Sequence, residues 1–185
     1  EDIEKHGADE LLSSVCGIVV PGGFGPRGVE GMIEAVRYAR EYDVPYLGLC
    51  LGLQVMVIEW ARNVLKIEDA NSEELTPETE NPVVHIMPEQ EGISSKGGTM
   101  RLGDYPCHPQ SNTLTKQAYG TDVIMERHRH RFELNNSYRE ALENSGLVVG
   151  GLSPNGNLVE TGEVSAHPFM VGTQYHPEFK SRPNR

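Results

Sequence analysis

The sequence feature that most constrains the fold is the run Gly-Leu-Cys-Leu-Gly at residues 48–52. It follows a short apolar stretch at residues 46–49 and begins a long apolar segment at residues 51–65, which predicts a strand, a sharp turn and a buried helix. Such a turn strains the backbone of its central residue, and a glycine on each side has no Cβ atom that could clash. The pattern therefore predicts a nucleophile elbow that exposes the Cys50 thiol at the carboxyl end of a strand.

The segments before this run repeat the alternation of strand and helix. Residues 17–20 form a short apolar run that ends in Pro-Gly-Gly, and residues 29–42 carry apolar side chains at helical spacing. The expected buried face of this helix is Ile33, Val36, Tyr38 and Ala39. Residues 1–14 are polar, with apolar positions that suit one short amphipathic helix. This alternation is typical of an α/β domain, so we expect a central, mostly parallel sheet flanked by helices.

The second half of the chain is richer in expected strands than in helices. The strand candidates are residues 123–126, 131–134, 147–152, 158–161 and 169–175. One short helix is expected at residues 137–144. Residues 68–98 are polar and contain three prolines, so we expect loops there around one short strand near residues 83–87.

Length and composition exclude several classes of protein. The 185 residues fit one domain, and 37% hydrophobic with 23% charged residues is typical of a globular protein. The formal net charge of -11 argues against nucleic acid as a main partner, because phosphate binding needs a basic surface. No apolar run is long enough to span a membrane. The cysteines Cys16, Cys50 and Cys107 form neither a disulfide framework nor a zinc motif, so we expect no metal and a cytoplasmic location.

A cysteine nucleophile needs a base and a group that orients this base. The best candidates lie in residues 174–179 (QYHPEF), where His176 and Glu178 are close enough for the carboxylate to hold the imidazole. At the N-terminus of a helix, the dipole favours negative charge, so we expect the Cys50 sulfur to be a thiolate. The alternatives are a buried structural cysteine and a solvated histidine at the end of a strand.

The glycine-rich residues 21–25 (PGGFG) follow the first expected strand. Such a loop can present backbone N–H groups to an oxyanion or to a phosphate. It lacks the Gly-Lys-Ser/Thr of a P-loop and the full Gly-x-Gly-x-x-Gly of a dinucleotide site. The other interpretation of these residues is a simple turn.

Together, the elbow cysteine, the later His-x-Glu pair and the glycine-rich loop resemble the class I glutamine amidotransferases, a family with a flavodoxin-like α/β fold. Five blocks narrow the resemblance to the glutaminase domains of the CTP synthase family. They are residues 20–30 (VPGGFGPRGVE), 46–54 (YLGLCLGLQ), 97–103 (GGTMRLG), 126–132 (ERHRHRF) and 174–182 (QYHPEFKSR). The blocks follow the expected order over almost the whole chain, and the third and fourth are much more specific than the triad itself.

The resemblance implies roles for individual residues. Cys50 would attack the side-chain amide of L-glutamine and form a γ-glutamyl thioester, while His176, oriented by Glu178, would move the protons. The backbone N–H groups of Gly23 and Leu51 would hold the oxyanion. The implied substrate contacts are Phe24, Gln54, Glu74 for the ammonium group and Arg131 for the carboxylate. Without the resemblance, the last two would be taken as ordinary surface charges.

Residues 126–133 (ERHRHRFE) have two interpretations. Alternating charge along a strand most often marks a solvated face. The resemblance instead implies a strand beside the glutamine pocket and next to a neighbouring domain.

The resemblance also implies that the chain is a fragment of a longer protein. The family domain has a strand and a helix before residue 1 and a helix after residue 185, so we expect a sheet without its first strand and without the C-terminal helix. The partner would be a synthetase domain that binds UTP, ATP and magnesium, in a homotetramer, while the glutaminase domain itself needs no cofactor. The lid that responds to GTP, an allosteric activator in the family, corresponds to the short segment at residues 88–96. Phe132 stands where tyrosine is more usual.

Three functions are compatible with these patterns. The first is hydrolysis of glutamine to glutamate and ammonia, with the ammonia used for ATP-dependent amination of UTP to CTP. The second is a related cysteine hydrolase, such as a γ-glutamyl peptidase, against which the block at residues 97–103 argues. The third is a regulatory or oligomerisation module without activity, against which the intact Cys50, His176 and Glu178 argue.

Overall fold

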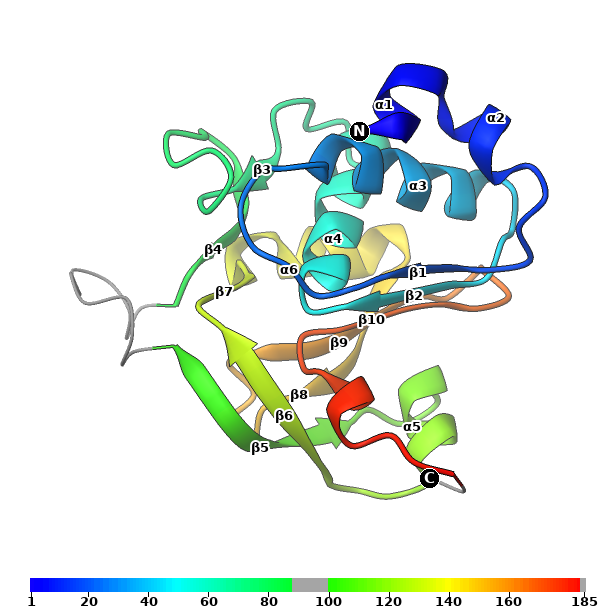
Figure 1. Ribbon diagram of the computed structural model, residues 1–185. Coiled ribbons are helices and arrows are strands. Elements are labelled where there is room, and N and C mark those ends of the chain that lie inside the picture. The colour runs from blue at the N-terminus through cyan, green and yellow to red at the C-terminus, as the bar shows by residue number, and fades with distance from the viewer. Residues whose placement is uncertain (88–99, 184–185) are drawn as a thin grey trace.

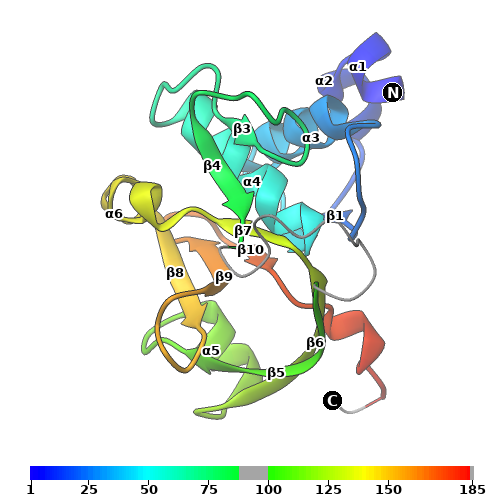
Figure 2. The same ribbon diagram turned by 90° about the vertical axis from the view of Figure 1, so that its left-hand side faces the viewer.

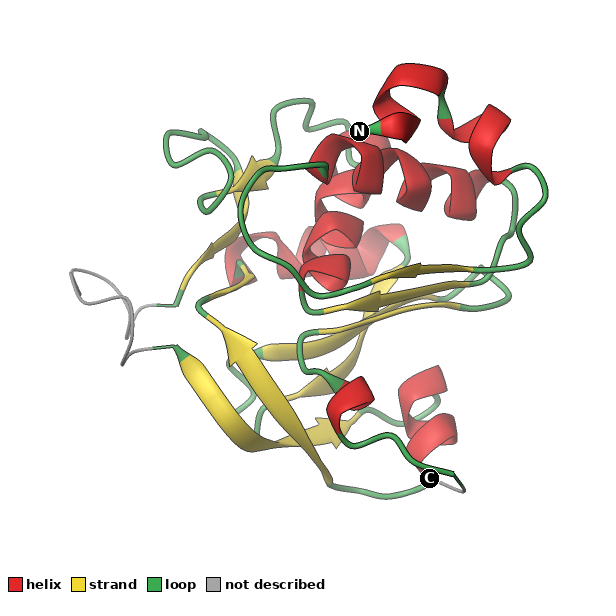
Figure 3. Ribbon diagram, viewed as in Figure 1, coloured by secondary structure: helices red, strands yellow, loops and turns green. Residues whose placement is uncertain are grey.

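The computed structural model describes residues 1–87 and 100–183, and its centre is a curled sheet of seven strands (Figures 1 and 3). The strand order is β1-β2-β10-β9-β8-β5-β6. The bounds are β1 (Ile18–Val20), β2 (Tyr46–Leu49), β5 (Arg101–Pro109), β6 (Ile124–His130), β8 (Leu147–Leu152), β9 (Val159–Val164) and β10 (Met170–Thr173). A second sheet contains β3 (Asn71–Ser72), β4 (Pro82–Ile86) and β7 (Phe132–Leu134).

The large sheet is mixed rather than mostly parallel. The pairs β1-β2 and β2-β10 are parallel, and they place Ile18 and Met170 on either side of Tyr46. The other four neighbouring pairs of the described sheet are antiparallel. Short turns connect β8 to β9 and β9 to β10. A short connection makes the next strand run in the opposite direction, whereas a parallel pair needs a long crossover. The α/β class with helices around a central sheet is confirmed, but the expected direction of most strands is wrong.

Two helices cover one face of the parallel strands. They are α3 (Val29–Glu41) and α4 (Leu51–Asn63), and α4 contacts both β2 and β10. The short helices α1 (Asp2–His6) and α2 (Ala8–Leu12) pack outside α3, and α5 (Leu114–Tyr119) and α6 (Asn136–Ser145) contact β8 (Figures 1 and 2). The single helix expected at residues 1–14 is two helices, because Gly7 between them has a φ of 84°.

The core confirms the helix patterns. The four residues expected on the buried face of α3 are all buried, and every residue of α4 from Leu51 to Ala61 is buried. Within α4 lies one carboxylate without exposed surface, Glu59, which pairs with Arg40 of α3 at 2.8 Å. A buried charge needs such a partner, so this ion pair ties the two helices together.

Strand β5, helix α5 and the two-residue strand β3 were not expected from the sequence. Strand β5 contains Pro106, Pro109 and Gly103, which disfavour strands, yet it pairs with β6 over seven residue pairs. Helix α5 has only six residues, too few for a clear periodic pattern, and Thr113 caps it by accepting from Lys116 N at 3.1 Å. Tertiary pairing and local capping therefore decide these segments, rather than hydrophobic periodicity.

None of the helices in the described ranges combines the length and the apolar character that a membrane span requires. The segment that the resemblance assigns to a GTP-sensitive lid, residues 88–96, lies outside the described residues, as do the first three residues of the block at 97–103.

Candidate active site

Cys50 occupies a strained turn between β2 and α4. Its φ of 54° and ψ of -98° lie in a region that residues with a side chain rarely adopt. A Cβ atom on Gly48 would lie 2.5 Å from the carbonyl carbon of Gly52, and one on Gly52 would lie 2.4 Å from Val20 O. The Cys50 N–H donates to Thr173 O at 2.7 Å, which fixes the turn against the end of β10. The two glycines are therefore required by close backbone contacts, as the sequence pattern predicts.

His176 and Glu178 follow the end of β10. The backbone N–H of His176 donates to Arg127 O of β6 at 2.8 Å, and its ring stacks on Phe179. His176 Nδ1 lies 2.7 Å from Glu178 Oε1. Because a carboxylate only accepts, we assign the proton to Nδ1, which leaves Nε2 with a free lone pair. Nε2 is buried and has no hydrogen-bond partner within the described part of the chain, so it is placed as a base.

Cys50 and His176 line the same cavity of about 330 Å³, together with the glycine-rich loop. A Cβ atom on Gly22 would lie 2.6 Å from His176 Cε1 and 3.6 Å from Cys50 Cβ, so this bare glycine fits between the two side chains. Among the described contacts, the Cys50 sulfur approaches Arg129 O at 3.8 Å and Gln174 Nε2 at 3.7 Å, and no hydrogen bond joins it to His176. The fold thus brings together groups that are 126 positions apart in the sequence.

The resting state of the Cys50 thiol differs from the expectation. Burial raises its pKa to about 12, and the carboxylates of Glu74 and Glu178 add to this effect. The Leu51 N–H and the Gln174 side chain act in the opposite direction. The sulfur is therefore a thiol at neutral pH rather than the expected thiolate, because loss of water outweighs the helix N-terminus. A base must take its proton during a reaction.

Cys50 also lines a larger cavity of about 640 Å³. Its lining includes all four residues that the family resemblance assigns to substrate contacts, namely Phe24, Gln54, Glu74 and Arg131. Glu74 Oε1 accepts from Gly25 N at 3.1 Å, which holds the carboxylate beside the glycine-rich loop. Gly23 lines both cavities with Cys50. The cavity thus has an acidic and a basic side chain near one thiol, an arrangement suited to a zwitterionic amino acid.

Strand β6 buries its histidines, so of the two interpretations of residues 126–133 a fully solvated strand is wrong. His128 and His130 are 0% and 2% exposed. Arg127, which precedes them, and Arg129, which lies between them, are exposed. The rings are linked by a 3.0 Å contact between His128 Nδ1 and His130 Nε2. His128 Nε2 lies 3.6 Å from Glu160, which pairs with an arginine of β5 at 2.7 Å. The strict alternation of His with Arg is the sequence signal for this two-faced strand, but charge alone could not tell which face is buried.

These histidines should make the fold sensitive to acid. Burial lowers the pKa of His128 to about 2 and that of His130 to about 3. Since both values lie below the unfolded value of about 6.5, the unfolded chain binds more protons in this window, and stability is lost as pH falls from about 6.5 toward 3. Each histidine adds a slope of up to about 1.4 kcal/mol per pH unit. The raised pKa of buried Glu160 opposes this slope in part.

The measurement is the free energy of unfolding between pH 7 and 5, followed by the fluorescence of Trp60, the single tryptophan. His128→Gln should flatten the slope because one buried titrating group is removed. His6→Gln is the control, since His6 is exposed on α1. Equal slopes in wild type and His128→Gln would show that the buried ring does not control acid stability.

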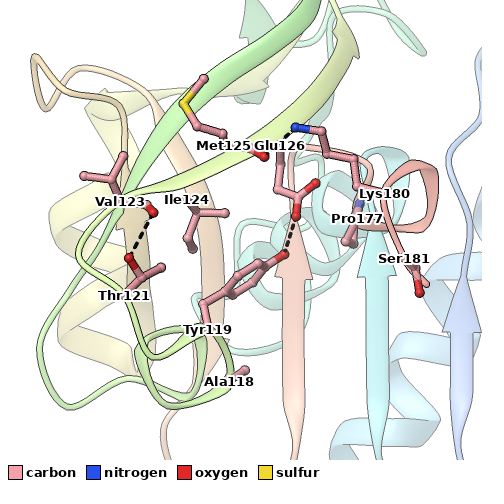
Figure 4. A pocket seen from close by; sticks show the side chains of 10 residues that line it. All are labelled: Ala118, Tyr119, Thr121, Val123, Ile124, Met125, Glu126, Pro177, Lys180 and Ser181. Atoms are coloured by element: carbon pink, nitrogen blue, oxygen red, sulfur yellow. Dashed lines mark hydrogen bonds between the residues drawn. The ribbon is translucent and has the colours of Figure 1, made fainter. Parts of the chain in front are cut away.

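A separate pocket of about 460 Å³ lies between α5, β6 and the 3-10 helix η2 (Pro177–Phe179) (Figure 4). Tyr119 donates to Glu126 Oε1 at 3.2 Å on one side of it, and Lys180 Nζ donates to Met125 O at 2.8 Å on the other. None of the residues that line this pocket lines either cavity beside Cys50. It is therefore distinct from the candidate active site.

Within residues 1–87 and 100–183, no three or more His, Cys, Asp or Glu side chains cluster in a way that could hold a metal ion. The site has the side chains for acid, base and nucleophile chemistry, with a buried thiol, an oriented imidazole and a polar cavity.

Comparison with known proteins identifies the family. Residues 2–185 match the family model for glutamine amidotransferase class-I. The chain is 63% identical to a CTP synthase of Dehalococcoides mccartyi and 60% identical to one of Clostridium perfringens, and it covers 34% and 35% of those proteins. The chain thus spans about a third of the length of the relatives it matches.

Among solved structures, the chain matches the glutaminase domain of Trypanosoma brucei CTPS with bound acivicin, at a TM-score of 0.90 and 39% identity. The match covers 99% of this chain and 72% of the other. The chain therefore belongs to the class I glutamine amidotransferase family, and its relatives place it with the glutaminase domains of CTP synthases.

Proposed function

We propose that the chain hydrolyses L-glutamine to glutamate and ammonia, with Cys50 as the nucleophile. The observation that carries this proposal is that the Cys50 elbow and the imidazole of His176 line one cavity, while a larger polar cavity opens beside the same sulfur. Membership of the class I glutamine amidotransferases supports the choice of substrate.

In the first half-reaction, His176 Nε2 takes the thiol proton while the Cys50 sulfur attacks the side-chain amide carbon of glutamine. The carbon–nitrogen bond then breaks, and the imidazolium returns its proton to the leaving nitrogen, which departs as ammonia. In the second half-reaction, His176 takes a proton from water, whose oxygen attacks the γ-glutamyl thioester. The carbon–sulfur bond then breaks, the imidazolium returns its proton to the Cys50 sulfur, and glutamate leaves. Glu178 keeps the ring in the required tautomer through its 2.7 Å contact with Nδ1.

The developing oxyanion would be held by the backbone N–H groups of Gly23 and Leu51. Leu51 follows the nucleophile at the start of α4, and Gly23 lies in the loop against it, where a Cβ atom would come within 3.1 Å of the Leu51 side chain. Preorganised donors of this kind stabilise the transition state more than the ground state.

The remaining assignments concern the substrate's other groups. The ammonium group of glutamine would lie near Glu74 and its carboxylate near Arg131, at the two charged parts of the larger cavity. Gln54 and Phe24 would contact the side chain of the bound glutamine. Arg129 lies over the Phe24 ring, with 5.3 Å from its guanidinium carbon to the ring centroid, and this contact supports the position of the ring.

The longer relatives suggest how the ammonia is used. Because the chain covers 34% of the CTP synthase from D. mccartyi, we propose that it serves as the glutaminase part of a CTP synthase. The ammonia would pass to a synthetase domain that aminates UTP with ATP and magnesium, in a homotetramer activated by GTP. ATP and magnesium would bind in the synthetase domain, outside residues 1–185.

The test is labelling of Cys50 by an electrophilic glutamine analogue, followed by peptide mass spectrometry. We expect labelling at Cys50 alone among the three cysteines, and protection by L-glutamine. A panel that compares ammonia release from glutamine with cleavage of γ-glutamyl dipeptides tests the substrate. Preference for the peptides would indicate a peptidase, and a folded sample without label or ammonia release would indicate a module without activity.

A further inference from the structure

A chain of buried hydrogen bonds ends on the sulfur of Cys50. Gln174 Nε2 lies 3.7 Å from Cys50 Sγ, and Gln174 Oε1 accepts from Gln54 Nε2 at 3.3 Å. Gln54 Nε2 also donates to the Phe132 carbonyl oxygen at 3.1 Å. Gln174 is 1% exposed and Gln54 is 4% exposed, so each amide depends on these protein partners rather than on bulk water.

The Phe132 carbonyl decides which way both amides point. A carbonyl oxygen only accepts hydrogen bonds, so Gln54 turns its NH₂ group toward it. The same NH₂ group reaches Gln174, which therefore turns its oxygen toward Gln54 and its own NH₂ group toward the sulfur. His130 Nδ1 approaches the same carbonyl at 3.0 Å and supports its position. The network thus presents a donor to the sulfur, because the reverse orientation of Gln174 would turn its NH₂ group toward that of Gln54 and leave two donors facing each other.

We propose that Gln174 is a further catalytic residue, whose side-chain N–H donates to the Cys50 sulfur and stabilises the negative charge that develops there when His176 takes the proton. This inference rests on the proposed function. Gln174 would then act in the proton-transfer step. This role is additional to the hydrogen bond that its backbone N–H donates to Glu160 O at 2.8 Å.

The other surroundings of the sulfur show why such a donor matters. In the thiol form, the S–H can donate to Arg129 O at 3.8 Å, but a thiolate has no proton to donate and would face this carbonyl with its charge. The carboxylates of Glu74 and Glu178 also oppose a negative sulfur, whereas the Leu51 N–H and Gln174 favour it. Hydrogen bonds strengthen when the acceptor becomes ionised, so the Gln174 contact is stronger in the thiolate state than in the thiol state.

The test is the rate at which iodoacetamide alkylates Cys50 between pH 6 and 10, read from the Cys50 peptide by mass spectrometry in the full-length protein. Iodoacetamide reacts with the thiolate rather than the thiol, so at equal access through the cavities that Cys50 lines, the rate reports the thiolate population. Gln174→Met keeps the size of the side chain but removes the donor. We expect it to slow alkylation by about 10- to 100-fold at neutral pH, the equivalent of one hydrogen bond to a charged group, and to shift the pH profile upward. The kcat for glutamine should fall with little change in KM.

Two further variants keep the test decisive. Gln174→Glu is isosteric and places an acceptor or a negative charge beside the sulfur, so it should slow alkylation at least as much as Gln174→Met. Gln54→Met leaves Gln174 in place but removes the donor that orients it, so it should slow alkylation less. Gln117→Glu is the matched control, because Gln117 is exposed on α5 and its substitution changes the charge far from these contacts. It should leave the profile unchanged.

An unchanged alkylation profile in folded Gln174→Met or Gln174→Glu would overturn the proposal, and so would a fall in glutaminase activity without any change in alkylation. If Gln174→Met does not fold, the profile of Gln174→Glu decides. Failure of the glutaminase proposal has a different signature: either the wild type releases no ammonia from glutamine, or Cys50→Ala keeps that release. An inactive Cys50→Ala together with a normal Gln174→Met profile would refute only the role of Gln174.

Discussion

Replacing Cys50 with alanine should lower the glutaminase rate by about 10⁴- to 10⁶-fold, the loss typical of removing a nucleophile. The reason is that no other thiol reaches the cavity: Cys107 is fully buried elsewhere against Ile124 and Tyr175, and Cys16 is exposed outside it. The measurement is release of glutamate from L-glutamine at saturating substrate. The fold should survive, since alanine only removes a sulfur atom from a residue that lines two cavities.

The controls separate chemistry from folding. Cys16→Ala changes the exposed thiol and should keep the wild-type rate. The unfolding midpoint of Cys50→Ala, read from Trp60 fluorescence, should stay close to that of the wild type, because alanine keeps the Cβ atom and therefore the same strained turn. Ammonia release at more than about one hundredth of the wild-type rate by folded Cys50→Ala would exclude Cys50 as the nucleophile.

Gly52→Ala should destabilise the chain by about 3 kcal/mol or more and abolish activity with it. Helix propensity alone predicts the opposite sign, because alanine inside a helix is favoured over glycine by about 1 kcal/mol. We expect the steric clash to outweigh helix propensity, because a Cβ atom at this position would lie 2.4 Å from Val20 O. This oxygen is a backbone atom of β1 and cannot move away by itself. The free energy of unfolding of the variant, measured by denaturant titration, tests which effect is larger.

Gly17→Ala is the matched control for this prediction. A Cβ atom on Gly17 would lie 3.5 Å from Pro45 O, an ordinary contact, so its unfolding free energy should change by less than about 1 kcal/mol. If Gly52→Ala were as stable as the wild type, α4 would have room to shift away from β1. The explanation of the glycine frame around Cys50 would then be wrong.

The local elements near the elbow could be predicted because their sequence signals are strong and close together. The expected strands at residues 17–20 and 46–49 correspond to β1 and β2, and the expected helices at 29–42 and 51–65 correspond to α3 and α4. Their apolar faces are set by the periodicity of the helix, which the chain carries in its own order of residues. Strand β5 could not be predicted in this way, because its prolines and glycine disfavour strands. Its pairing with β6 makes this segment a strand.

The sequence and the family resemblance named residues that the structure brings together around Cys50, but they did not predict the protonation state of the thiol. The pattern of residues 48–52 and the spacing of His176 and Glu178 indicated the nucleophile and the oriented base, and the family resemblance supplied Glu74 and Arg131. The protonation of the Cys50 thiol was expected wrongly, because the helix N-terminus is visible in the sequence whereas the burial that raises the pKa is not.

By itself, the sequence determined the elbow, the helices that pack on β1 and β2, and the chemical groups available for a reaction, since all of these depend on residues close together along the chain. Only the tertiary structure decided which face of β6 is buried, that most of the sheet is antiparallel, and that the amides of Gln54 and Gln174 lead to the sulfur of Cys50. The physical reason is that burial and hydrogen bonding across 120 or more residues depend on how the strands are ordered, and no local pattern encodes that order.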